Sequence, residues 1–147
     1  MSNASAKILL VEDNKDDEEL TLRALRQNKI GDDVIVARDG VEALDFLFSR
    51  GDADVSSDKQ MPNVVLLDLN LPRVNGLEVL KAMRADERTS SLPVVVLTSS
   101  NEEKDIQRSY QSGANSYIRK PLDYRKFVDV VEKIGDYWLD LNQGPAN

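Results

Sequence analysis

Five short apolar runs, separated by segments of helical periodicity, constrain the fold of this 147-residue chain more than any other feature. The runs are residues 7–11, 33–37, 63–67, 93–97 and 115–118. The first, third and fourth are apolar throughout, which is typical of strands covered on both faces in a parallel sheet. Helical patterns occupy residues 15–28, 40–49, 76–85, 101–112 and 123–141. The alternation predicts one doubly wound α/β domain of (βα)5 type with right-handed crossovers.

Three segments fall outside this pattern. Residues 1–6 are interpreted as a flexible tail or a cloning remnant and residues 142–147 as a C-terminal tail, so the domain is expected to span residues 7–141. The connection over residues 49–62 is 14 residues long, whereas a loop between a helix and the next strand usually has about 2–6 residues. It is either a tolerated surface insertion or a loop that contacts a partner.

The composition excludes several kinds of chemistry. The chain has no histidine and no cysteine, so it cannot form disulfides, thiolate metal sites, serine–histidine triads or a histidyl phosphate. Its 26 acidic and 19 basic residues give a formal charge of −7, which argues against a nucleic-acid or membrane surface. The lack of a long apolar run and of a signal peptide favours a cytoplasmic protein. Any bound metal must be a hard cation with oxygen ligands, such as Mg²⁺ or Mn²⁺.

Polar side chains directly follow four of the predicted strands. Parallel α/β sheets bind ligands outside the carboxyl ends of their strands, and the residues at these ends are Glu12, Asp13, Asp68, Thr98 and Lys120. Three clustered carboxylates repel one another unless one is protonated or a cation lies among them. A cation, an ammonium and a hydroxyl would together stabilise a transferring phosphoryl group, and a carboxylate can accept that group. The set therefore predicts a Mg²⁺-dependent phosphoacceptor site.

Each of these residues has a plainer explanation when it is taken alone. A pair such as Glu12 and Asp13 is more often an acidic turn at a strand end or the N-cap region of the next helix, and Thr98 is a common kind of strand end. Asp68 is harder to explain in that way, because a charge in an apolar run is costly to bury unpaired. The acidic residues 16–19 are interpreted as the solvated start of a helix, where negative charge is favourable. The occurrence of all these residues together at one edge of the sheet, in this order along the chain, favours a functional site over the plainer explanations.

The motifs at these positions resemble those of the receiver domain of two-component response regulators. They are LLVEDN at 9–14, LLDLNLP at 66–72 with Asn75-Gly76, LTS at 97–99 and RKP at 119–121. The resemblance covers roughly residues 6–140 and implies a CheY-like, flavodoxin-like fold with strand order 2-1-3-4-5. It also implies a stand-alone receiver without an output domain, similar to the single-domain regulators that partner phytochrome histidine kinases.

The resemblance implies how the acidic residues act. Asp68 matches the phosphoacceptor of the family. Glu12 and Asp13 match the acidic pair that holds Mg²⁺ or Mn²⁺ together with Asp68, and Asn70 matches the position that offers its backbone carbonyl to the metal. The pair is Glu-Asp here rather than the more usual Asp-Asp, and it should still bind the cation.

The same resemblance implies a switch. Thr98 matches the hydroxyl that moves towards the phosphoryl group, and Lys120 matches the lysine that pairs with it. Tyr117 matches the aromatic residue whose ring changes between outward and inward positions. Pro121 matches a proline that follows a cis peptide bond in this family.

The implied function is a phosphorelay switch rather than a metabolic enzyme. A sensor histidine kinase, with a phytochrome-type kinase as the candidate, would donate the phosphoryl group. Six of the eight aromatic residues follow residue 109, and the adjacent Tyr137 and Trp138 cannot both face the core, so one is a candidate exposed anchor. We expect a homodimer or partner contact through the fourth helix, the fifth strand and the fifth helix.

Two other functions are considered. A phosphohydrolase of the aspartyl-nucleophile type uses an Asp-x-Asp motif, but this chain has Asn70 in place of the second carboxylate, and Asn cannot exchange the proton. A phosphate-independent interaction module with the same fold would have no need of the complete polar set at the strand ends.

Overall fold

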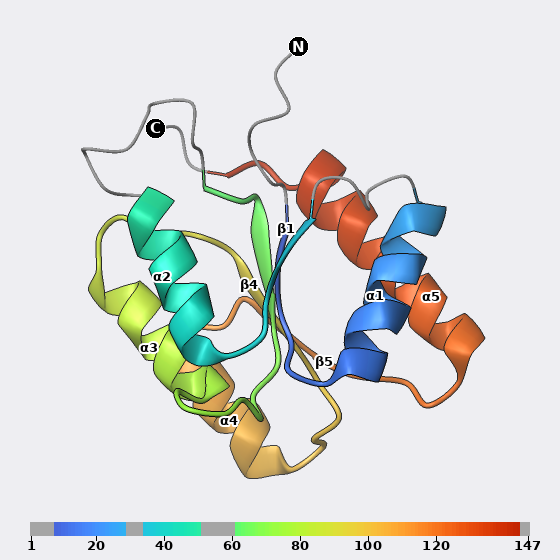
Figure 1. The fold of residues 1–147 in the computed structure, drawn as a ribbon, viewed down its shortest axis with the longest axis horizontal. Coiled ribbons are helices and arrows are strands. Elements are labelled where there is room, and N and C mark those ends of the chain that lie inside the picture. The colour runs from blue at the N-terminus through green and yellow to red at the C-terminus, as the bar shows by residue number, and fades with distance from the viewer. Residues whose placement is uncertain (1–7, 29–33, 51–60, 145–147) are drawn as a thin grey trace.

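A five-stranded parallel sheet forms the centre of the molecule in the computed structural model, which describes residues 8–28, 34–50 and 61–144 (Figure 1). The strands lie in the order β2-β1-β3-β4-β5, as the family resemblance implied. They are β1 (Ile8–Val11), β2 (Val34–Ala37), β3 (Val64–Leu67), β4 (Val94–Thr98) and β5 (Ser116–Arg119). The predicted N-terminal tail, residues 51–60 of the long loop and residues 145–147 of the C-terminal tail lie outside the described residues.

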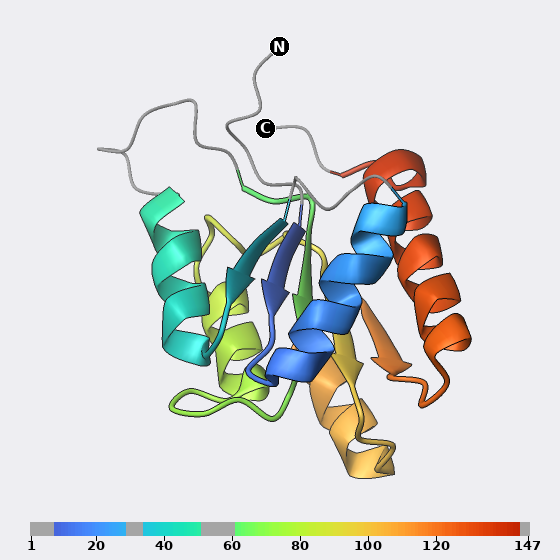
Figure 2. The ribbon, with the colours of Figure 1, turned by 45° about the vertical axis from the view of Figure 1, so that its right-hand side comes forward.

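Five α-helices cover the two faces of the sheet. They are α1 (Lys15–Gln27), α2 (Gly40–Arg50), α3 (Gly76–Ala85), α4 (Glu103–Gln111) and α5 (Tyr124–Gly135). Helices α1 and α5 lie on one face and α2, α3 and α4 on the other, and all five strands run in the same direction (Figures 1 and 2). This arrangement confirms the predicted doubly wound α/β fold. None of the helices in the described ranges is long and apolar enough to cross a membrane.

Two helices differ from their predicted bounds by more than one residue. Helix α4 begins two residues later than expected, because the Ser100 hydroxyl donates to the Asp105 carboxylate at 2.6 Å and accepts the Glu102 amide at 3.3 Å. These bonds hold the preceding turn in a non-helical shape. The predicted helix over 123–141 is α-helical only to Gly135, and a π-helical segment, η2 (Asp136–Leu141), follows it. The amide of Asn142 closes this wider turn on the carbonyl of Tyr137.

The core consists of two apolar layers, one on each side of the sheet. Strands β1, β3 and β4 are buried along their whole length, as their uninterrupted apolar sequences predicted. Successive side chains of a strand point to opposite faces, so Leu9 packs towards α2 and α3 while Ile8 and Leu10 pack towards α1 and α5. With both faces covered, polar ligands have access to the sheet at its ends.

Gly76 allows α3 to begin directly against the end of β3. A Cβ atom at this position would lie 2.7 Å from the Cα of Leu69 and would also meet the backbone carbonyl of Asp68. The amide of Gly76 donates to the Leu69 carbonyl at 3.0 Å, and Asn75 caps the helix in a capping box with Glu78. The backbone that carries Asp68 is thereby packed tightly against a rigid helix.

Candidate phosphoacceptor and metal site

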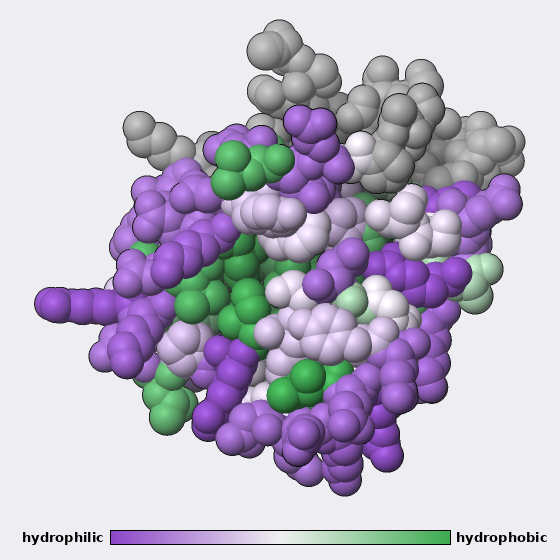
Figure 3. All heavy atoms as spheres, turned by 180° about the vertical axis from the view of Figure 1, so that it is seen from behind, coloured by the Kyte–Doolittle hydropathy of each residue, from purple (hydrophilic) through white to green (hydrophobic). Residues whose placement is uncertain are grey.

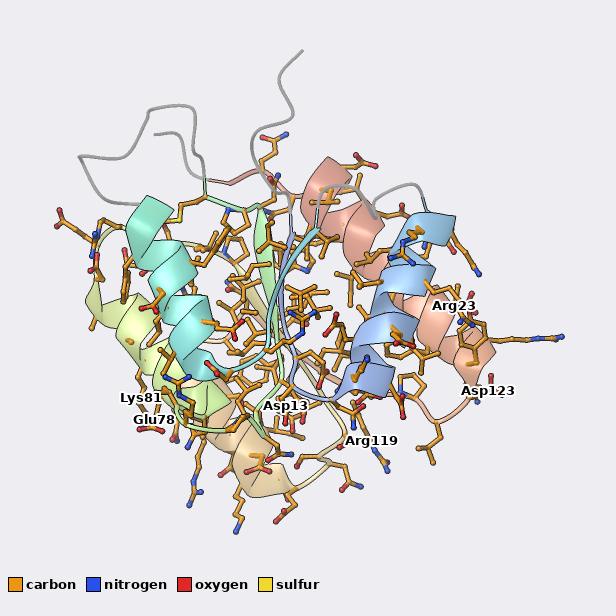
Figure 4. The ribbon with its side chains drawn as sticks, in the orientation of Figure 1. Asp13, Arg23, Glu78, Lys81, Arg119 and Asp123 are labelled. Carbon is orange, nitrogen blue, oxygen red and sulfur yellow. The ribbon has the colours of Figure 1, made fainter. Side chains whose placement is uncertain are left out.

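The sheet itself positions the polar residues that follow its strands. The amide of Glu12 donates to the carbonyl of Ala37 at 3.0 Å, that of Asp68 to Val11 at 3.1 Å, and that of Lys120 to Thr98 at 2.7 Å. Each of these residues directly follows the last residue of its strand, and its backbone amide continues the hydrogen bonding between strands. The strand ends therefore meet at one edge, where Asp13 also lies (Figure 4).

The ammonium group of Lys120 lies at the centre of this edge. Its Nζ atom donates to Glu12 Oε1 at 2.6 Å, to Asp17 Oδ2 at 2.8 Å and to Asp68 Oδ2 at 3.1 Å. A lysine ammonium has three donors, so every donor has a carboxylate partner. The side chain is only 8% exposed, and burial in contact with three acceptors makes this a charge network rather than a surface ion pair.

The carboxylates of Glu12, Asp13 and Asp68 offer oxygens that all lie within 4.8 Å of one another. Two of the three residues are buried, and Asp13 is exposed. The backbone amide of Asn14 donates to Glu12 and that of Asn70 donates to Asp68, which orients both buried carboxylates. Oxygen donors of this kind are the ligands that Mg²⁺ and Mn²⁺ prefer. The donor set therefore fits a divalent cation, as the sequence predicted.

Burial and the repulsion between like charges make it costly in free energy to keep the carboxylates of this site ionised without a cation. Burial raises the pKa of Glu12 to about 7, and the neighbouring Asp68 adds to this shift although Lys120 opposes it. Burial alone would lower the pKa of Lys120, but the hydrogen bonds that its ammonium donates to Asp17 and Glu12 outweigh this effect and raise the pKa. Lys120 therefore keeps its charge, and a divalent cation would favour the ionised form of Glu12.

Thr98 and Tyr117 lie beside this centre. Thr98 ends β4, is fully buried, and its hydroxyl accepts the amide of Ser100 at 3.5 Å. The Tyr117 hydroxyl donates to the carbonyl of the same Ser100 at 3.0 Å. Burial and the charge of Asp105 raise the pKa of Tyr117, so its hydroxyl stays protonated as a donor. The loop after β4 thus connects the two residues for which the family resemblance implies a switch.

The prediction of a cis peptide bond before Pro121 is wrong for this structure. No peptide bond among the described residues is cis, and the Lys120–Pro121 bond is one of these. The trans isomer of a bond to proline is favoured by about 0.5–1 kcal/mol. Since Lys120 reaches all three carboxylates with the trans bond, the contacts of the lysine do not require the other isomer.

Two of the acidic residues at 16–19 are not part of a solvated helix start. Asp16 and Glu19 are exposed as predicted. Asp17, however, contacts Lys120, and the Glu18 carboxylate is buried and receives two hydrogen bonds from Arg38, at 3.1 and 3.0 Å. Asn14 caps α1 by accepting the amide of Asp17, which makes Asp17 the third residue of the helix. A side chain at this position reaches back towards the cap, a signal that sequence reasoning did not use.

An anchor for the loop between β3 and α3 was not predicted from the sequence. The Arg73 guanidinium donates to the buried carboxylate of Asp39 at 3.2 Å, and Asp39 also caps α2 by accepting the amide of Glu42. Arg73 has a φ of 68°, the left-handed region that residues with a side chain seldom adopt. A Cβ at Gly40 would lie 2.7 Å from the Cβ of Val74. The loop that carries Asn70 is thereby held against the start of α2.

Comparisons with known proteins agree with this geometry. The family model of the response regulator receiver domain matches residues 8–132. The chain is 41% identical over 139 residues to the probable methanogenesis regulatory protein FilR2 of Methanothrix harundinacea, covering 95% of this chain and 87% of that protein. It is 38% identical over 145 residues to the response regulator Rcp1 of Synechocystis sp., covering 99% and 97%.

Solved structures give the same result. The phosphorylated cyanobacterial phytochrome response regulator RcpA is 38% identical, with a TM-score of 0.84 and coverage of 97% of this chain and 100% of that one. The Mn²⁺-bound form of Rcp1 is 37% identical, with a TM-score of 0.81 and coverage of 95% and 98%. The acidic cluster of this chain and the Mn²⁺ in Rcp1 agree with divalent metal binding. The chain belongs to the response regulator receiver domain family.

Proposed function

We propose that this protein is a two-component response regulator that accepts a phosphoryl group on Asp68 from a sensor histidine kinase in the cytoplasm. The observation that carries the proposal is the contact of Lys120 with Asp68 inside a buried acidic cluster. The identity to regulators whose names refer to phytochromes supports a phytochrome-type kinase as the donor. The chemistry is self-modification of one residue and not turnover of a metabolite.

In the proposed transfer, a carboxylate oxygen of Asp68 attacks phosphorus, the P–N bond to the donor imidazole breaks, and a P–O bond to Asp68 forms. Lys120 is positioned to pair with an oxygen of the transferred group, since its ammonium already lies 3.1 Å from Asp68. Thr98, at the end of the neighbouring strand, would donate its hydroxyl to another. These contacts would stabilise the negative charge on the oxygens of the phosphoryl group, which the free carboxylate does not carry.

A divalent cation held by Glu12, Asp13, Asp68 and the backbone carbonyl of Asn70 would supply neutralisation of the phosphoryl charge. The chain's own contribution is the orientation of these ligands. Glu12 and Asp68 are each fixed by a backbone amide, from Asn14 and Asn70 respectively. Asp13 is exposed, which leaves the site open to the incoming donor.

Phosphorylation of Asp68 is tested with a small phosphoryl donor and Mg²⁺, followed by intact mass. We expect the wild type to gain one phosphoryl group and Asp68→Asn to gain none, because an amide is not a nucleophile of this kind. Asp129→Asn, the same change at an exposed position of α5, should be labelled like the wild type. Equal labelling of Asp68→Asn would refute the proposal, and multiple turnover of a phosphate ester would favour a phosphohydrolase instead.

We further propose that the face formed by α4, β5 and α5 mediates self-association. A cavity of about 450 Å³ opens between β5 and α5, and its apolar lining includes Ile118, Val130 and Ile134. Figure 3, which views the edge of the sheet at β5, shows apolar side chains gathered in this region and polar side chains around them. Of the adjacent aromatic residues, Trp138 packs on the core and Tyr137 is 48% exposed, so Tyr137 is the candidate anchor of the proposed contact.

The oligomeric state is tested by sedimentation over a concentration series, with and without a phosphoryl analogue. We expect Tyr110→Glu, on the exposed side of α4, to shift the protein towards monomer, because it replaces an exposed aromatic side chain of the proposed interface by a charge. Ile35→Glu serves as the control, since Ile35 is a partly exposed apolar residue on β2 at the opposite edge of the sheet. A wild type that stays monomeric under all conditions would contradict the proposal.

A further inference from the structure

We propose that Asp17 is a positioning residue of the phosphoacceptor site, which holds the Lys120 ammonium when a divalent cation engages Glu12 and Asp68. The inference rests on the proposed function for the importance of Lys120. It concerns a residue on α1 that lies outside the strand ends on which the site was predicted.

The contact between Asp17 and Lys120 is comparable in length to those inside the predicted site. The distance from Lys120 Nζ to Asp17 Oδ2 is 2.8 Å, between the 2.6 Å to Glu12 and the 3.1 Å to Asp68. Asp17 is also held firmly, because its amide donates to Asn14 and its carbonyl accepts the hydroxyl of Thr21. A carboxylate on a capped helix turn keeps its place when its neighbours move.

Asp17 binds the ammonium but stands apart from the metal ligands. The compact group of oxygens within 4.8 Å comprises Glu12, Asp13 and Asp68, and Asp17 does not belong to it. Its side chain is 35% exposed, against 2% for Glu12. Two of the three partners of Lys120 therefore also belong to the group of carboxylates that could hold a cation, and the third does not.

This division of partners has an electrostatic consequence. A divalent cation repels the ammonium and competes with it for the oxygens of Glu12 and Asp68. Lys120 is buried, so losing both partners without a replacement would leave a charge unpaired. Asp17 lets Lys120 stay paired and close to Asp68, where it can meet an arriving phosphoryl group.

The first test compares Asp17→Asn with Asp16→Asn. Both changes remove one carboxylate from the first turn of α1, but Asp16 is exposed and has no part in the contacts of Lys120. NMR of the ¹⁵N-labelled lysine ammonium groups should resolve a slowly exchanging Lys120 signal in the wild type and in Asp16→Asn. We expect this signal to shift and exchange faster in Asp17→Asn, and Asp17→Glu should restore it in part.

The second test measures Mg²⁺ affinity by calorimetry, without a phosphoryl donor. We expect Asp17→Asn to weaken binding roughly three- to tenfold and Asp16→Asn by less than about twofold, because only Asp17 receives the displaced ammonium. In a Lys120→Met background the two changes should have equal effects. This double-mutant comparison isolates the part of the effect that passes through Lys120.

Two results would overturn the inference. One is an equal loss of Mg²⁺ affinity for Asp17→Asn with and without Lys120, which would mean that Asp17 acts on the cation by its charge alone. The other is a Lys120 signal that does not change in Asp17→Asn, a result that stands even if Lys120→Met does not fold. Neither measurement involves phosphorylation, so a failure of the Asp68 proposal would be seen separately.

Discussion

Replacing Lys120 by methionine is expected to destabilise the metal-free protein by roughly 3 kcal/mol, since removing one partner of a buried charge network leaves the others uncompensated. The lysine is 8% exposed and contacts Glu12, Asp17 and Asp68. Methionine has a similar length without the charge, so the change isolates electrostatics from packing. Urea unfolding in the presence of a chelator measures the loss.

The same variant should recover stability when Mg²⁺ is added, because a cation among Glu12, Asp13 and Asp68 substitutes for the ammonium. It should also fail to accept a phosphoryl group at the wild-type rate. Combining Lys120→Met with Asp68→Asn removes one of the repelling charges and should restore part of the stability without any metal.

Lys104→Met is the matched control for this prediction. Lys104 pairs with Glu102 at 3.8 Å, and both side chains are 63% exposed. A surface pair of this kind contributes about 0–1 kcal/mol, so the control should unfold almost like the wild type. A Lys120→Met protein as stable as this control in the absence of metal would show that the buried network does not contribute to folding.

Arg84→Ala is expected to reduce the free energy of unfolding by about 3 kcal/mol, because the guanidinium is a charged donor to four backbone carbonyls. It donates to the carbonyls of Thr89, Ser90 and Leu92 at 2.8–3.1 Å and to that of Gly113 at 2.9 and 3.0 Å. One side chain thus joins the end of α3 to the segments that lead into β4 and β5. Urea unfolding measures the effect.

Two variants separate the hydrogen bonds of Arg84 from its charge. Arg108→Ala removes a basic residue from the last turn of α4, as Arg84→Ala does from α3, but Arg108 is exposed. It should cost less than about 1 kcal/mol, the usual contribution of a charge near a helix end. Arg84→Lys keeps the charge but cannot reproduce the planar fork, so it should recover less than half of the loss. Equal stability of Arg84→Ala and Arg108→Ala would contradict the prediction.

Much of the fold could be predicted because its signals are local. The uninterrupted apolar sequences of β1, β3 and β4 predicted strands buried on both faces, and these are buried as expected. The helix over 76–85 has the predicted bounds, since Asn75 and Glu78 form a capping box within the same turn. The strand order followed from the family motifs, because the pairing of distant strands leaves no trace in periodicity.

The predicted strand-end residues Glu12, Asp68 and Lys120 do lie together, and the reason is also simple. Parallel strands in register bring their carboxyl ends to one edge, so a residue that follows a strand must lie there. The bond before Pro121 could not be predicted from the chain itself, since trans and cis isomers differ by only about 0.5–1 kcal/mol and tertiary contacts select between them.

The sequence by itself determined the elements, the edge of the sheet that carries the chemistry and the kinds of side chain found there, because all three depend on short-range pattern and on strand direction. Only the tertiary structure decided which charges meet. Asp16 and Asp17 are alike in sequence, yet only Asp17 reaches Lys120, 103 residues away. The packing of α1 on the sheet turns one carboxylate inward and leaves its neighbour in water, and that rotation is set by contacts between distant parts of the chain.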